Sequence, residues 1–187
     1  KPPHDMSDSG VNTPAGPGSG PGLFSFPPVS WAWLLLTAVV ISLDLHTKQL
    51  ASDARVLYRP HEVFSWLNMT LAHNYGAAFS FLSSAGGWQR WFFIVLASAV
   101  SLVLLVWLIR LPRREWMTGL GLALILGGAI GNLVDRIRLG YVVDFIDFHI
   151  GGWHYPAFNV ADSAITCGVI LLLLDVLLVS LRSKKEA

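Results

Sequence analysis

Cysteine and charge are both scarce in this sequence, and each scarcity excludes a class of protein. The chain has one cysteine, Cys167, among 187 residues, which excludes an internal disulfide, a CxxC pair and a thiolate metal cluster. Cys167 lies inside a long apolar run, where we expect a small buried side chain rather than a reactive thiolate. Charged residues make up 13% of the chain and the net charge is +1, so no basic field for nucleic-acid binding exists.

Apolar residues are abundant instead. They make up 53% of the chain, and the mean hydropathy of +0.55 is typical of a membrane protein. A helix needs about 20 mostly apolar residues to cross the hydrocarbon, and four stretches meet that demand. We therefore predict an all-α polytopic membrane protein whose transmembrane helices cover residues 29–50, 88–109, 115–135 and 157–181.

The spans define a single membrane-embedded domain over residues 29–181. Residues 1–28 are rich in Gly, Pro and Ser and cannot bury a core, so we predict a disordered N-terminal tail. Residues 182–187 form a short basic tail. Basic residues also fill the loop between the second and third spans, and the positive-inside rule makes this side cytoplasmic. The residues that set this orientation are Arg110, Arg113, Arg114, Arg182, Lys184 and Lys185.

Two polar segments, residues 51–87 and 136–156, then emerge on the outer side. In the first, Leu67, Met69 and Leu71 alternate with polar residues, and this period of two predicts a strand. Asn74-Tyr75-Gly76 supplies a turn before the short apolar run AAFSFL. The pattern predicts a small sheet on the membrane surface, although an ordinary hairpin loop explains it equally well.

Four aspartates gather at the predicted outer boundary: Asp44, Asp135, Asp144 and Asp162. A carboxylate at the edge of the hydrocarbon is costly unless it is paired or lines a wet cavity, which makes each a functional candidate. Asp144 and Asp162 have no adjacent cation and would face each other if the second polar segment folds back. Two close carboxyl groups share one proton, so one can activate water while the other protonates a substrate carbonyl. Asp147 rivals Asp144 on chemistry alone.

The remaining acidic and small residues have structural interpretations. Asp44 and Lys48, at i and i+4, can form an ion pair that orients the helix end, and this is as plausible as a substrate role. Asp135 is expected to pair with Arg136 or Arg138. Small residues recur at every fourth position of the third span and predict close packing against a neighbouring helix. They are Gly119, Ala123, Gly127 and Gly131.

Other activities fit less well. His149 and His154 are the only loosely spaced histidine pair, and no HExxH or GxSxG motif is present, so no metal site, cofactor or serine nucleophile is predicted. A small proton- or cation-coupled transporter also needs intramembrane carboxylates, but transporters place them near the midplane within internal repeats. A scaffold subunit, in which the aspartates form only structural pairs, is the remaining alternative.

Several motifs in register resemble the lipoprotein signal peptidase (signal peptidase II) family, a family of bacterial inner-membrane aspartyl proteases. They are DLHTK (44–48), HNYGAAFS (73–80), GGAIGNLVDR (127–136), VVDF (142–145) and FNVADS (158–163). The resemblance implies a catalytic dyad of Asp144 and Asp162, in preference to Asp147. It also implies that further residues bind substrate or support the site, namely Asp44, Lys48, Asn74, Gly76, Asn132, Arg136, Asn159 and Ala161.

The same resemblance implies a β-sheet cradle on the outer surface and a short extracytoplasmic helix, carried by the 136–156 connector, that can gate the site. The implied substrate is a diacylglyceryl-modified prolipoprotein, cut just before the lipidated cysteine, and the implied inhibitor is the cyclic peptide globomycin. The enzyme is then expected to be a monomer in the inner membrane, with both termini cytoplasmic, its active site at the outer face and membrane lipid around it.

Overall fold

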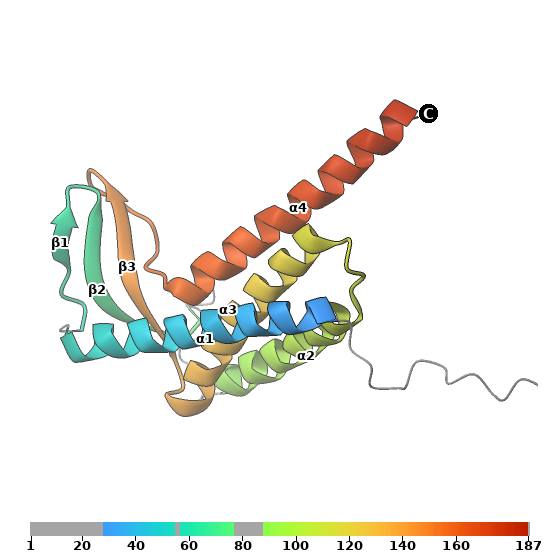
Figure 1. Cartoon of the computed structure of the whole chain (residues 1–187). Helices are drawn as coiled ribbons and strands as arrows, with labels where there is room; N and C mark the ends of the chain where they lie inside the picture. Colours follow the sequence, from blue (N-terminus) through green and yellow to red (C-terminus); the bar gives the residue numbers. More distant parts are fainter. Residues whose placement is uncertain (1–27, 55–56, 77–87, 187) are drawn as a thin grey trace, which may run out of the picture.

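The computed structural model describes residues 28–54, 57–76 and 88–186, which form a bundle of long helices with a small sheet at one end (Figure 1). We call this end of the bundle the sheet end. Four helices are long and apolar enough to cross a membrane, as predicted. They are α1 (Pro28–Ala54), α2 (Trp88–Arg110), α3 (Trp116–Arg138) and α4 (Val160–Glu186).

The sheet is antiparallel, in the order β1-β2-β3-β4. Its strands are β1 (His61–Phe64), β2 (Leu67–Asn74), β3 (Val142–Ile150) and β4 (Trp153–His154). The strand predicted from the alternation at Leu67 to Leu71 is confirmed as β2, and it belongs to a sheet rather than to a plain hairpin loop. The turn is confirmed as well, because Gly76 has a φ of +106° and its N–H donates to Asn74 Oδ1 at 2.8 Å. The AAFSFL run lies outside the described residues.

The connector between α3 and α4 differs from its prediction. The family resemblance implied a helix here, but residues 142–150 and 153–154 form β3 and β4, and β3 pairs with β2 over most of its length. The expectation of a helix here was wrong because the apolar run VVDFIDF satisfies its backbone hydrogen bonds with a strand more than 60 residues earlier in the chain. The part of the chain that the structure describes has no short helix outside the four long ones.

Helix α3 packs between α1 and α4, and its small residues explain why. The predicted stripe faces α1: a Cβ built on Gly119 would lie 2.5 Å from Trp33 and one on Gly127 would lie 2.7 Å from Val40. A Cβ on Gly131 would touch the Asp44 carboxylate. Other glycines of α3 face α4, where a Cβ on Gly128 would collide with the main-chain oxygen of Ala161. Both helices therefore approach the α3 backbone closely, α1 at several levels from Gly119 to Gly131 and α4 at Gly128.

The sides of the bundle that face away from α3 are apolar and exposed, as expected for surfaces covered by lipid. Cys167 lies there, on an exposed face of α4, so the expected buried position was wrong. When the side chains of a helix are apolar on every side, its sequence does not show which side contacts protein and which contacts lipid. The packing of α4 against α3, which only the structure shows, leaves Cys167 exposed.

Candidate active site

Asp144 lies on β3 at the sheet end of the bundle and is 2% exposed. Asp144 is paired with Ala72 of β2 in the sheet, and the side chain of Asn74 is hydrogen-bonded to the Asp144 carboxyl group. Burial and, to a smaller extent, the charge of Asp162 raise the pKa of Asp144, hydrogen bonds from Asn74 and Asn159 lower it, and the net effect is a pKa of about 7. Asp144 therefore holds a proton through much of the neutral pH range.

Asp162 lies in the first turn of α4, where its position is fixed by a reciprocal cap. The Asp162 N–H donates to Asn159 Oδ1 at 2.9 Å, and the Asn159 N–H donates to Asp162 Oδ2 at 3.3 Å. This is the capping-box arrangement, with Asn159 preceding the helix and Asp162 three residues later. Asn132 of α3 donates to the other oxygen of Asp162, Oδ1, at 2.8 Å.

Asn159 links the two aspartates. Its side chain is fully buried, and its Nδ2 donates to Asp144 Oδ1 at 2.7 Å while its main chain binds Asp162. The same Nδ2 lies 3.2 Å from the Val143 carbonyl oxygen and 3.3 Å from Asn132 Oδ1. Asn159 therefore connects β3, α3 and α4, and it brings Asp144 and Asp162 to the same small polar site.

Asp44 and Lys48 support this site from α1. Lys48 Nζ lies 2.7 Å from Asp44 Oδ2, which confirms the predicted i, i+4 ion pair, and it donates to Asn132 Oδ1 at 2.9 Å. Asp44 Oδ1 accepts the N–H of Ala161 at 2.8 Å. Through these bonds α1 fixes the side chain of Asn132 and the first turn of α4.

Arg136 and Gly76 complete the predicted set. The Arg136 guanidinium interacts electrostatically with Asp144 and Asp162, donates to the Asn132 carbonyl at 3.2 Å, and lies 5.3 Å from the centre of the Phe93 ring. Phe93 is also the neighbour of Gly76, where a Cβ would approach its ring to 2.7 Å. The structure thus places every sequence-predicted site residue at the sheet end.

Asp147 points elsewhere. It lies three positions after Asp144 on β3, so the two side chains leave opposite faces of the strand. Asn68 Nδ2 donates to Asp147 Oδ2 at 2.9 Å, and His154 Nδ1 lies 2.8 Å from Oδ1. Burial raises the pKa of Asp147, but the bonds to His154 and Asn68 outweigh burial and hold the pKa below its usual value. Asp147 is paired within the sheet.

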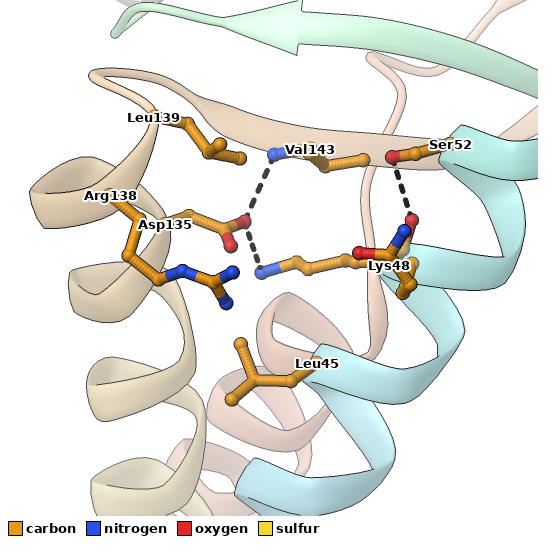
Figure 2. Close-up of a pocket in the computed structure, with 8 residues that line it drawn as sticks. Leu45, Lys48, Ser52, Asp135, Arg138, Leu139 and Val143 are labelled. Carbon is orange, nitrogen blue, oxygen red and sulfur yellow. Dashed lines mark hydrogen bonds and ion pairs between the residues drawn. The ribbon is translucent and has the colours of Figure 1, made fainter.

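Asp135 was expected to pair with a neighbouring arginine, and this was wrong. The Asp135 side chain is buried; its Oδ2 lies 3.0 Å from Lys48 Nζ and accepts the Val143 N–H at 3.1 Å (Figure 2). An i, i+1 or i, i+3 pairing is the natural choice from sequence, and nothing local indicates a lysine 87 residues earlier.

Arg90 of α2 was also missed. It donates to the carbonyls of Arg136 at 3.0 Å and Ile137 at 2.6 Å, and so caps α3.

A small cavity of about 50 Å³ lies beside Lys48 and Asp135, between α1, the end of α3 and the start of β3 (Figure 2). Its volume suits one or two water molecules and not a peptide. Among the described residues, no group of three or more His, Cys, Asp or Glu side chains is arranged to hold a metal ion.

Comparison with known proteins gives a consistent result. Residues 36–178 match the family model described as signal peptidase (SPase) II. Proteins named lipoprotein signal peptidase are similar to this chain. The one from Acinetobacter baumannii strain SDF is 52% identical, and the aligned region covers 89% of this chain and 94% of the length of that protein. The one from Teredinibacter turnerae is 53% identical over 76% of this chain and 85% of its own.

A solved structure of a bacterial membrane enzyme, 32% identical, superposes with a TM-score of 0.70 and covers 79% of this chain and 93% of its own. The family match, the named relatives and the similarity of fold agree with one another. The chain belongs to the signal peptidase II family of membrane peptidases.

Proposed function

We propose that this protein is an aspartyl endopeptidase that removes signal peptides from diacylglyceryl-modified prolipoproteins and cuts just before the lipidated cysteine. The observation that carries the proposal is that Asn159 donates one hydrogen bond to Asp144 and another to Asp162. Family membership supplies the substrate class, and the named relatives support it. The transporter and scaffold alternatives have no comparable support, because no observation on the site favours them.

The dyad acts through one shared proton. Asp144 carries it, because its pKa is raised to about 7, and Asp162 accepts hydrogen bonds from Asn132 and Asn159 on both oxygens. Asp162 removes a proton from water while the water oxygen attacks the scissile carbonyl carbon. Asp144 gives its proton to the carbonyl oxygen. Asp162 then protonates the leaving nitrogen as the C–N bond breaks, and Asp144 recovers its proton from the collapsing intermediate.

Arg136 and Asn132 assist this chemistry without exchanging protons. The Arg136 guanidinium faces the two aspartates and can hold a substrate carbonyl by charge-assisted hydrogen bonds. Asn132 holds Asp162 in the orientation in which it can bind water. A lipid-anchored substrate moves only in the bilayer, so its scissile bond reaches the depth at which the helices end. This is the depth of the dyad.

The proposal includes the location of the enzyme. The protein spans the bacterial inner membrane with both termini in the cytoplasm, and the sheet end faces outward. The enzyme acts as a monomer in this proposal. We further propose that globomycin occupies the position of the substrate beside Asp144 and Asp162.

The test uses the purified protein in lipid bilayers and two forms of one prolipoprotein, with and without the diacylglycerol group. Mass spectrometry of the products should show a single cut before the modified cysteine, and globomycin should suppress it. The unmodified precursor should be cut at least about tenfold more slowly, because it is not presented at the interface. A cut at another position, or equal rates on the two precursors, would contradict the proposed specificity.

A further inference from the structure

Each aspartate of the dyad follows a residue whose main chain is held by a second carboxylate. Ala161 precedes Asp162, and its N–H donates to Asp44 Oδ1 at 2.8 Å. Val143 precedes Asp144, and its N–H donates to Asp135 Oδ2 at 3.1 Å. The supporting carboxylates come from α1 and α3, so each half of the dyad is attached to a helix other than the element that carries it.

Lys48 joins these two supporting carboxylates. Its Nζ lies 2.7 Å from Asp44 Oδ2 and 3.0 Å from Asp135 Oδ2, and it donates to Asn132 Oδ1 at 2.9 Å. The contact with Asn132 is a hydrogen bond and the other two are ion pairs, so one ammonium group joins residues of α1 and α3. A continuous chain of polar contacts therefore runs from Ala161 through the lysine to Val143. Figure 2 shows the Asp135 half of it, with Lys48 reaching across from α1.

The three charged groups are almost fully buried. Asp44 is 0%, Lys48 3% and Asp135 4% exposed. Removing charges from water is costly, and a buried ionic group can often be replaced by neutral residues without loss of stability. Stability alone is thus a weak reason for three buried charges at this place. Their arrangement fits a geometric role, because each contact fixes a main-chain position next to a catalytic side chain.

We propose that Asp44, Lys48 and Asp135 form a brace that sets the separation of Asp144 and Asp162. The proposal rests on the proposed aspartyl mechanism for its catalytic meaning. The three are positioning residues, which act through the main chain of Val143 and Ala161 and do not touch the substrate. Asp135 is the member that the sequence analysis interpreted as a structural partner of Arg136 or Arg138.

The separation matters because the two carboxyl groups share one proton only while they are close. A misplacement of about 1 Å in a catalytic group can cost on the order of 100-fold in rate. Asp144 lies on β3 and Asp162 lies on α4, and these elements are joined by a 9-residue connection, 151–159. The brace limits the movement of one element relative to the other.

The test is a neutral version of the brace, Asp44→Asn with Lys48→Met and Asp135→Asn. Each asparagine keeps an oxygen to accept the Ala161 or Val143 N–H, so the variant loses the link between the two halves and the hydrogen bond from Lys48 to Asn132. Asn159 still donates to Asn132 Oδ1 and holds that side chain. Thermal unfolding should stay within a few degrees of wild type, because no unpaired charge is left behind. The kcat should fall by about 10- to 100-fold with KM unchanged.

Asp53→Asn is the matched control, because it removes an exposed carboxylate from the same helix, and Asp53 accepts a hydrogen bond from Gln49 on that helix. It should leave kcat and thermal unfolding at wild-type values. The second readout is a crystal structure of the neutral variant in lipid. We expect a larger distance between the Asp144 and Asp162 carboxyl groups than in wild type.

An unchanged distance would overturn the brace, whatever the activity. If the neutral variant does not fold, the same distance in the single Asp135→Asn variant decides the question. The two proposals fail separately. A wild-type protein that cuts no prolipoprotein would refute the proposed function, while the distance in the variant would still confirm or refute the brace.

Discussion

A single residue, Asn159, lies between two aspartates and gives each a defined environment. Its Nδ2 donates to Asp144, which is buried and has a raised pKa, and its main-chain N–H donates to Asp162 in the first turn of α4. Two carboxyl groups of one chemical type thereby receive different surroundings. This difference is what an acid and a base need in order to act as a pair.

The protonation of Asp144 predicts a pH effect on stability. A carboxyl group whose pKa rises from 3.8 to about 7 on folding contributes stability below about pH 4, and this contribution is lost as the pH rises through 7. The unfolding temperature of wild type, relative to that of Asp144→Asn, should therefore fall between pH 4 and 7 and level off above 8. Thermal unfolding in bicelles measures it. A difference that is constant with pH would contradict a raised pKa.

At the residue scale, sequence reasoning went as far as the local motifs allowed. It found that Asp144 and Asp162 lacked adjacent cations, and it predicted the Asp44 to Lys48 pair, because both inferences use short sequence distances. It could not choose between Asp144 and Asp147 on chemistry, since their strand faces depend on register. It assigned Asp135 to the wrong partner, because that contact crosses from α3 to α1.

Among the elements, α3 determines how closely the site is assembled. Its glycines let α1 and α4 reach its backbone at the level of Asn132 and Asp135. Sequence alone predicted this stripe and the strand β2, because both repeat with a fixed period. It did not predict β3, since a nearly continuous apolar run fits a helix or a buried strand equally well. The partner strand of β3 is remote in the sequence, so no local pattern resolves the ambiguity.

The glycine contacts predict a large effect from one methyl group. Gly128→Ala would place its Cβ against the main-chain oxygen of Ala161, which cannot move without shifting the first turn of α4. We expect a loss of about 1–3 kcal/mol in unfolding free energy, as for other overpacked sites, together with loss of cleavage. Unfolding in detergent mixtures and a cleavage assay measure the two effects.

The control for this variant is Gly152→Ala, at the β3–β4 turn. A Cβ there meets nothing within 4 Å, and the backbone does not require glycine. Stability and activity should match wild type. Equal behaviour of the two alanine variants would show that α3 and α4 are not in close contact at Gly128.

For the molecule as a whole, the sheet lies at one end of a bundle of four helices long and apolar enough to cross a membrane (Figure 1). The site residues lie on the elements that meet at this end. The sequence predicted this convergence well, since hydropathy locates the spans and the motifs lie at their ends. Sequence also identified the family, because several motifs in register are more specific than any one of them. The shape of the sheet end required the structure, since two separate segments build it together.

The predicted orientation can be tested with single cysteines in a Cys167→Ala background. Gly152→Cys lies at the sheet end, and Lys184→Cys lies near the opposite end of α4. A membrane-impermeant maleimide added to intact spheroplasts should label the first, and should label the second only after the membrane is opened. The reverse pattern would place the sheet end in the cytoplasm and contradict the positive-inside assignment.

The most direct measurement of the central claim is cleavage of a diacylglyceryl prolipoprotein by purified Asp144→Asn, Asp162→Asn and Asp147→Asn proteins in bilayers. Each variant removes one carboxylate, and Asp147 is the matched control because it lies on the same strand as Asp144 but pairs with Asn68 and His154. We predict a loss of at least about 1000-fold in kcat for the first two, consistent with the loss of an essential acid or base, and near wild-type activity for the third. Substantial cleavage by a folded Asp144→Asn or Asp162→Asn protein would contradict the account.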